Sequence, residues 1–133
     1  MQTKTITQTT TFLVNPEKVY NSLMNSKEHS AFTGDKAVVS AKVGGTFSVW
    51  SGFITGKNIK LIKNKKIVQA WKSTMDGWPA KHYSTVTFAL QKTKTGTKLV
   101  FTHKNIPASC AKDISKGWKE YYWKPMKKYF SQR

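Results

Sequence analysis

The sequence contains one cysteine, one arginine and six acidic residues among 133, and each of these shortages excludes a class of protein. A single cysteine, Cys110, cannot form an intrachain disulfide, so the fold does not depend on an oxidising compartment. No stretch approaches the roughly 18 apolar residues of a membrane span, and the threonine-rich residues 1–12 lack the apolar core of a signal peptide. We therefore expect a cytoplasmic protein without a membrane span.

Acidic residues are so few that the formal net charge is +17. Such a charge attracts nucleic acid, anionic membranes and acidic protein surfaces. Of the 23 basic residues, however, all but the terminal Arg133 are lysine. Proteins that read base edges or bind phosphate with two parallel hydrogen bonds favour arginine. The composition therefore predicts only a non-specific attraction to polyanions, which fades as salt is added.

The residues that catalysis needs do not occur in a recognisable arrangement. There is no glycine-rich phosphate loop. The sequence indicates no histidine partner for Cys110, so Cys110 is interpreted as a structural thiol. The acids show no pairing for acid-base chemistry, and the histidines lack metal-ligand spacing. The acids are Glu17, Glu28, Asp35, Asp76, Asp113 and Glu120, and the histidines are His29, His82 and His103. We therefore expect no catalytic residues, no metal and no cofactor.

What the sequence does contain is enough apolar surface for one core. Hydrophobic residues make up 38% and aromatic residues 13%, which predicts a single domain over residues 1–133. Residues 3–14 alternate as a strand does. Asn15-Pro16-Glu17 then signals the start of a short helix, with Asn15 as N-cap, and Ser26 is placed to cap a second short helix that ends near Thr33-Gly34.

From residue 37 the pattern is that of short strands separated by brief turns, which favours an antiparallel meander. One of these strands places Val86, Phe88 and Leu90 on a common face. The expected strands cover residues 37–41, 47–50, 54–62, 66–74, 83–90 and 98–103.

The last segment, from Cys110 to Phe130, has its apolar residues at helical spacing, which predicts a long amphipathic helix. Its apolar stripe is expected to include Ile114, Trp118, Tyr121, Tyr122 and Met126. Pro125 should kink this helix, and Gly117 is typical of a place where the backbone approaches something closely. The long helix is the element large enough to cover an apolar sheet face, so the fold class is α+β.

Several short motifs, in order from about residue 6 to residue 130, match one family. They are Asn15-Pro16-Glu17, Ala31-Phe32-Thr33, Gly44-Gly45-Thr46-Phe47, Thr55-Gly56, Ile67-Val68-Gln69-Ala70-Trp71, Trp78-Pro79-Ala80-Lys81-His82-Tyr83, Gly96-Thr97-Lys98-Leu99, Ile106-Pro107, Gly117-Trp118 and Tyr121-Tyr122. The chain resembles the activator of heat-shock protein 90 ATPase homologue family, of the START-like (SRPBCC, birch-pollen-allergen-like) superfamily. The resemblance implies a helix-grip fold, with an antiparallel sheet wrapped around a long C-terminal helix and two short helices after the first strand.

The resemblance also implies a function. In the eukaryotic co-chaperone a domain of this type follows a separate N-terminal domain, for which this sequence shows no counterpart. We therefore expect a stand-alone, non-enzymatic binding module with the heat-shock protein 90 chaperone as partner. The partner-binding candidates are Lys63, Lys65 and Lys66 at one turn, and Trp78 with Lys81 in the next loop, where Trp78 is expected to be exposed.

Two alternatives remain open at this point. In the wider superfamily the space between sheet and helix often holds an apolar ligand, so the chain is also a candidate carrier of a small apolar molecule. The residues expected to line that cavity are Trp50, Trp71, His82, His103, Trp118 and Tyr122. The second alternative is an enzyme of the cyclase or hydratase kind found elsewhere in the superfamily. The absence of a carboxylate pair from the sequence counts against it.

Overall fold

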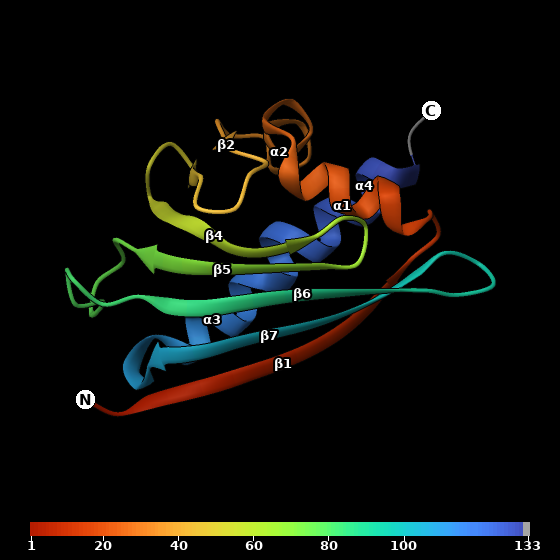
Figure 1. Ribbon diagram of the computed structural model, residues 1–133. Coiled ribbons are helices and arrows are strands. Elements are labelled where there is room, and N and C mark those ends of the chain that lie inside the picture. The colour runs from red at the N-terminus through yellow and green to blue at the C-terminus, as the bar shows by residue number, and fades with distance from the viewer. Residues whose placement is uncertain (132–133) are drawn as a thin grey trace.

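Seven antiparallel strands form one curved sheet in the computed structural model, which describes residues 1–131 (Figure 1). The strands are β1 (Thr3–Phe12), β2 (Val38–Val39), β3 (Thr46–Val49), β4 (Ile54–Ile62), β5 (Lys66–Ser73), β6 (Ser84–Lys92) and β7 (Thr97–Pro107). Their order in the sheet is β1-β7-β6-β5-β4-β3-β2, so the first strand lies beside the last. The meander predicted from the sequence is confirmed, although β2 is shorter and β7 longer than expected.

Two short helices, α1 (Pro16–Met24) and α2 (Ser26–Thr33), separate β1 from β2. The side chain of Asn15 accepts a hydrogen bond from the Lys18 backbone N–H, which confirms Asn15 as the N-cap of α1. The N-cap of α2 is Asn25, not Ser26 as predicted. The Ser26 hydroxyl instead accepts a hydrogen bond from the Val39 N–H at 2.8 Å, and so ties α2 to β2.

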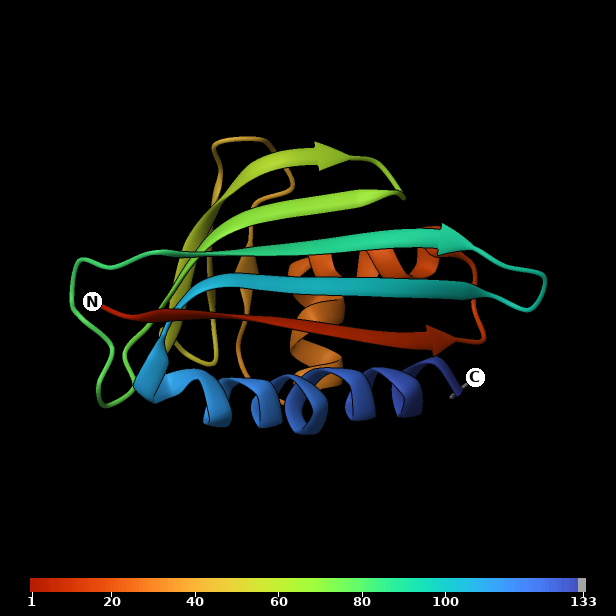
Figure 2. The ribbon, with the colours of Figure 1, turned by 90° about the horizontal axis from the view of Figure 1, so that it is seen from below.

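The C-terminal helix lies along the inner face of the sheet, as Figure 2 shows. It begins with a 3-10 turn (Ala108–Cys110) and continues as α3 (Ala111–Trp118), a π-helical turn (Lys119–Trp123) and α4 (Lys124–Ser131). In the π turn the Lys124 N–H donates to the Lys119 carbonyl, five residues back. The irregularity expected at Pro125 therefore takes the form of a wider turn just before it. A proline ring in a regular helix clashes with the carbonyl four residues back, here that of Tyr121.

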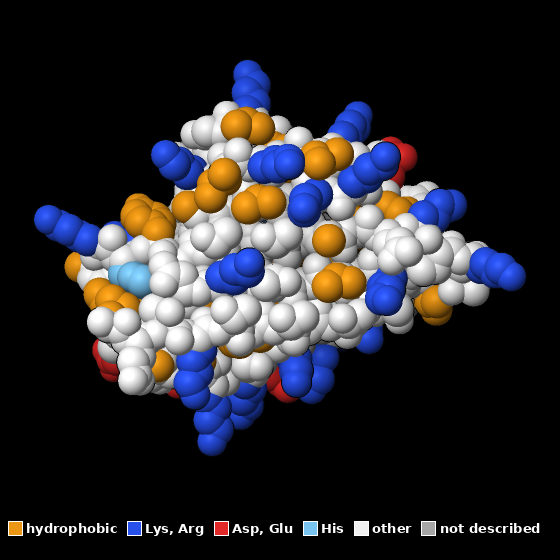
Figure 3. Space-filling view, turned by 60° about the horizontal axis from the view of Figure 1, so that its bottom comes forward, with side chains coloured by type: hydrophobic (Ala, Val, Ile, Leu, Met, Phe, Trp, Pro, Cys, Tyr) orange, Lys and Arg blue, Asp and Glu red, His pale blue; other side chains and the backbone are white. Residues whose placement is uncertain are grey.

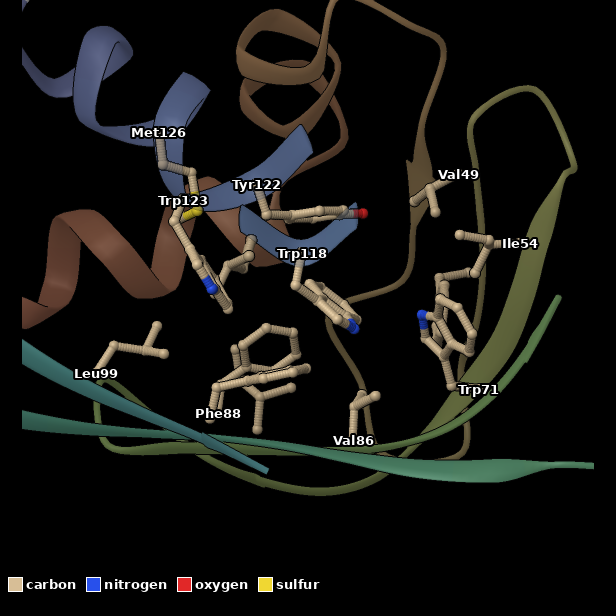
Figure 4. Packing of buried hydrophobic residues seen from close by; sticks show 14 of the residues in the cluster. Val49, Ile54, Trp71, Val86, Phe88, Leu99, Trp118, Tyr122, Trp123 and Met126 are labelled. Atoms are coloured by element: carbon tan, nitrogen blue, oxygen red, sulfur yellow. The ribbon is translucent and has the colours of Figure 1, made fainter. Parts of the chain in front are cut away.

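This π turn changes which side chains reach the core. Trp118, Tyr122 and Trp123 all point toward the sheet and are about 5% exposed or less (Figure 4). Tyr121 was predicted on the apolar stripe, but it is 59% exposed, so that prediction is wrong. Trp123 was not predicted to be buried. A period of 3.6 residues does not place Trp118, Tyr122 and Trp123 on one side, whereas one inserted residue in the turn does.

The space between the helix and the sheet is filled mainly by aromatic rings. The Trp118 ring lies 4.4 Å from the Phe101 ring and 4.6 Å from the Tyr122 ring, centre to centre. Val86, Phe88 and Leu90 project inward from β6, as predicted. A sheet that holds a long helix against its inner face is the helix-grip arrangement. Its centre is packed by these rings.

One glycine of the sheet allows two neighbours to approach closely. A side chain at Gly56 in β4 would overlap both the Ala70 carbonyl oxygen and the Phe47 ring. Glycine at this position therefore keeps β4 in contact with the strands on either side of it.

Candidate functional site

One open apolar groove lies between the turn that follows β3 and the start of the C-terminal helix. Its volume is about 200 Å³. Ligand pockets for drug-sized molecules usually span about 300–1,000 Å³, so this groove suits a smaller molecule. Its rim carries Phe53 and Tyr121, which are 47% and 59% exposed. The lining residues are Trp50, Phe53, Ile54, Trp71, Met75, Asp113, Ile114, Gly117, Trp118, Tyr121 and Tyr122.

The turn that forms one wall of the groove has a strained backbone. Trp50 and Ser51 both have positive φ, at 55° and 56°, a region that bulky residues rarely occupy. The Ser51 hydroxyl donates to the Asp35 carboxylate at 2.6 Å, and the Ser51 N–H donates to the Lys36 carbonyl. These contacts hold the turn, and the Trp50 ring meets the Tyr121 ring edge-on at 5.5 Å. Backbone strain of this kind costs on the order of 1–3 kcal/mol per residue and is often found at binding sites.

His103 does not line the groove, although it was a cavity candidate. It is completely buried, and its Nδ1 accepts a hydrogen bond from the Trp118 indole at 3.0 Å. The Ser84 hydroxyl donates to the Trp71 carbonyl, so His103 Nε2–H must donate to that hydroxyl. Burial lowers the pKa of His103 to about 3. A neutral imidazole with both nitrogens bonded is part of the core and is not free to orient a ligand.

His29 forms a second buried polar cluster that the sequence did not indicate. Its Nδ1 lies 3.1 Å from the Leu23 carbonyl, so this nitrogen donates, and Nε2 accepts from the Tyr122 hydroxyl at 3.0 Å. Burial lowers the pKa of His29 and raises the pKa of Tyr122. Both groups are therefore neutral, and they fix the Tyr122 ring between α2 and the sheet. The remaining gap around them measures only about 20 Å³, space for about one water.

His82 is placed away from the groove. Its Nε2 donates to the Asn105 carbonyl at 2.7 Å at the margin of the sheet. Of the six cavity candidates, the structure brings four to the groove: Trp50, Trp71, Trp118 and Tyr122. Phe53, Met75 and Tyr121 also line it. Their proximity depends on the turn after β3 and on the π turn, which no local sequence pattern indicates.

The candidates for partner binding fall into two separate groups. Lys63 and Lys65 are exposed at the β4–β5 turn and Lys66 is half-buried, whereas the exposed Lys81 follows β5. β5 separates the groups, because Lys66 is its first residue and Lys81 follows its last, and its eight residues span roughly 25 Å. The groups therefore lie at opposite ends of the sheet and do not form one patch.

Trp78 is buried, contrary to the prediction of an exposed loop tryptophan. It is 7% exposed, its indole donates to the His82 carbonyl at 2.9 Å, and its ring lies 5.5 Å from the Trp71 ring. The loop after β5 folds back onto the end of the core, so Trp78 contributes to packing. It is not available to a partner on the surface.

Three further features concern metal ligands, membrane-spanning helices and the single thiol. Within residues 1–131, no three side chains of His, Cys, Asp or Glu are grouped in a way that could hold a metal ion. Among the helices that the structure describes, none combines the length and apolarity of a membrane-spanning segment. Cys110 is buried and its thiol donates to the Asp76 carbonyl at 3.7 Å, which fits the structural role expected for it.

A sheet that grips a C-terminal helix, with an apolar groove at one end, defines a START-like helix-grip domain. The model of the family "Activator of Hsp90 ATPase homolog 1-like protein" matches residues 13–131. The match covers most of the chain, and the chain belongs to this family. The resemblance stated from the sequence motifs is therefore confirmed.

Individual relatives agree with this assignment. The activator of 90 kDa heat shock protein ATPase homolog 1 of Homo sapiens is 31% identical over 125 residues, which are 94% of this chain and 36% of that protein. A homologue from Dictyostelium discoideum is 31% identical over 132 residues, 97% of this chain and 33% of that protein. The chain thus spans about a third of the length of the curated relatives it matches. The crystal structure of PFC0360w, an HSP90 activator from Plasmodium falciparum, superposes with a TM-score of 0.88 at 31% identity, covering 96% of both chains.

Proposed function

We propose that this chain is a non-enzymatic binding module that contacts the Hsp90 chaperone in the manner of a co-chaperone. The observation that carries the proposal is the similarity, over 96% of both chains, to a protein described as an HSP90 activator. The relatives from Homo sapiens and Dictyostelium discoideum carry the same description. The net charge of +17 supports it, because a strongly basic module associates quickly with an acidic protein surface.

The contact is expected to be weak. The chain corresponds to only about a third of the length of its curated relatives, so any contacts made by the rest of those proteins are not supplied by these residues. We expect a Kd of about tens of micromolar at low salt, which is roughly 6 to 7 kcal/mol of binding free energy. Stimulation of ATP turnover by Hsp90 should be small or absent.

A titration of the purified protein into Hsp90 at low salt tests this proposal. Heat of binding should be detectable at tens of micromolar and should diminish as salt is added, since the charges are exposed. ATP turnover is measured on the same samples. Undetectable heat rejects the chaperone as partner. Strong stimulation would instead show that these residues suffice for activation.

The apolar groove supports a second candidate function, the binding of a small apolar ligand. Its walls are almost entirely apolar, with Asp113 as the one charged lining residue. An apolar cavity of about 150 Å³ in another protein binds benzene. A groove of about 200 Å³ is therefore suited to one or two fused rings.

Filling the groove provides a specific test. A Cβ at Gly117 would meet only the Tyr121 ring, at 3.8 Å, and Gly117 lines the groove. We therefore expect the Gly117→Leu variant to fold, with the leucine projecting into the groove. We expect this variant to lose saturable binding of a naphthalene-type fluorescent dye. The control, Gly117→Ala, adds one methyl group, should gain about 1 kcal/mol of helix stability and should keep the dye. The absence of saturable binding to the wild-type protein would reject the ligand-carrier function.

A further inference from the structure

The outer face of the sheet, which points away from the C-terminal helix, has a floor of short uncharged side chains. The strand register places them in straight rows across the sheet. One row runs Thr7, Thr102, Thr87 and Val68, and it ends at Lys60. The floor as a whole consists of Thr7, Thr9, Val68, Ala70, Thr85, Thr87, Ala89, Val100 and Thr102.

Lysines surround this floor. The row through Thr85 and Ala70 has a lysine at each end, Lys104 on β7 and Lys57 on β4. Figure 3 shows this side of the molecule, with lysines spread over a white surface that carries several hydrophobic patches, and with carboxylates only at its margin. The lysines of the outer face are Lys57, Lys60, Lys66, Lys72, Lys98 and Lys104.

No acidic residue accompanies these lysines. All six acids of the chain lie in helices or connecting segments, and none lies in a strand. Within residues 1–131 the single ion pair joins Lys124 to Glu120, both on the C-terminal helix. Among the residues that the structure describes, no carboxylate therefore pairs with a lysine of the outer face, and the face carries a net positive charge.

Protection of sheet edges does not account for this arrangement. Natural proteins place lysines on edge strands to prevent aggregation. The edge strands are β1 and β2, and β3 pairs only with residues 54–57 of β4, so Lys60 lies on a free stretch of β4. By contrast, Lys57, Lys66 and Lys98 each have a paired residue on both sides. A solvated face without a binding role would tolerate carboxylates, which are absent from every strand.

We propose that the outer face is a docking surface for an acidic patch of a partner protein. This inference rests on the chaperone contact proposed above and names the surface that makes it. The floor itself carries no aromatic ring. Tyr83, just before β6, is 51% exposed at the margin of the outer face, but the Lys72 ammonium lies over its ring, 5.5 Å from the centre. The strands contain no arginine, so the rows of stacking rings and the bidentate base contacts that favour nucleic acid are missing. Short threonine side chains let a partner approach the sheet closely, while the lysines around them reach its carboxylates.

The size of the outer face agrees with a weak complex. Five strands about 4.8 Å apart, and the six steps of about 3.4 Å between Lys98 and Lys104, enclose roughly 400 Å². A standard interface buries about 800 Å² on each partner. The outer face therefore suits a transient contact whose rate of formation is raised by charge.

Two triple variants with equal changes in net charge test the proposal. The first replaces Lys57, Lys60 and Lys104 with glutamine. The second replaces the exposed Lys112, Lys119 and Lys127 of the C-terminal helix with glutamine. Both lose three charges, so general attraction falls equally. We expect the sheet variant to raise the Kd for Hsp90 about tenfold or more, and the helix variant less than about threefold.

A single substitution tests whether the centre of the floor contacts the partner. The outward-facing Thr87 is replaced by Glu, with Thr87→Gln as the control of equal size. The Glu variant should weaken binding about tenfold and the Gln variant little, with thermal unfolding used to verify that both fold.

The outcomes separate the two proposals. If the wild-type protein gives no heat of binding when it is titrated into Hsp90, the chaperone contact itself is rejected. If both triple variants weaken Hsp90 binding equally, the chaperone contact stands, but the outer face is not its docking surface. A short duplex DNA, titrated in parallel, should lose affinity equally for both triple variants, because counterion release depends on the number of charges. Selective loss of DNA binding in the sheet variant, with Hsp90 binding intact, would assign the face to nucleic acid and overturn the proposal.

Discussion

Replacing Trp118 with Ala is expected to reduce the free energy of unfolding by about 3–5 kcal/mol. The Trp118 ring is 4% exposed, packs against the rings of Phe101 and Tyr122 and donates the hydrogen bond that His103 Nδ1 accepts. Its removal leaves a cavity at the point where the C-terminal helix meets the sheet. Because domains of this size are stable by only about 5–15 kcal/mol, the loss is a large fraction of the total.

The measurement is chemical denaturation of the wild-type and variant proteins at neutral pH. Tyr121→Ala is the matched control, since it removes an aromatic ring three residues further along the same helix. Tyr121 is 59% exposed, and we expect its loss to cost less than about 1 kcal/mol. A midpoint that is unchanged in Trp118→Ala would contradict the packing of the helix on the sheet.

Acidification should destabilise the protein through His103. The pKa of His103 in the folded chain is lowered to about 3 by burial, from the ordinary 6.5 that the unfolded chain retains. Between these values the unfolded chain binds a proton that the folded chain does not, so stability falls as the pH falls from 6.5 toward 3. The slope approaches about 1.4 kcal/mol per pH unit, and the full loss amounts to roughly 4–5 kcal/mol.

The test is the slope of unfolding free energy against pH between about 6 and 4. The His103→Gln variant loses absolute stability, because the buried partners Trp118 and Ser84 are disturbed, but its slope should be shallower by about 1.4 kcal/mol per pH unit. The buried His29, whose pKa is also lowered, contributes in the same direction and remains in the variant. His82→Gln, at the margin of the sheet, is the control. Identical slopes in the wild-type and His103→Gln proteins would disprove a neutral, buried His103.

The fold was predictable from the sequence because its signals are local. The cap at Asn15, the alternation in Val86, Phe88 and Leu90, and the helical spacing from Ile114 to Met126 each determine one element. Since only the long helix can cover the sheet, the arrangement follows from the elements. Local signals failed where the helix departs from 3.6 residues per turn, and for that reason Tyr121 was assigned to the core and Trp123 was missed.

The candidate sites were less predictable because they depend on contacts between distant segments. Whether a loop tryptophan is exposed depends on how its loop folds back, and Trp78 packs against Trp71. Neighbouring turns in sequence need not be neighbours in space, and β5 separates Lys65 from Lys81. The outer face could not be read from the sequence, since its rows are set by the register of β1, β7, β6, β5 and β4 together.

The central claim is that this chain binds Hsp90 through the outer face of its sheet. The most direct test is the amide NMR spectrum of the isotope-labelled protein, recorded at low salt with and without unlabelled Hsp90. We expect the largest changes in signal position or intensity at residues of the outer face, among them Thr87, Val100 and Thr102. Changes confined to the apolar groove around Trp50 and Tyr121, or no changes at all, would contradict it.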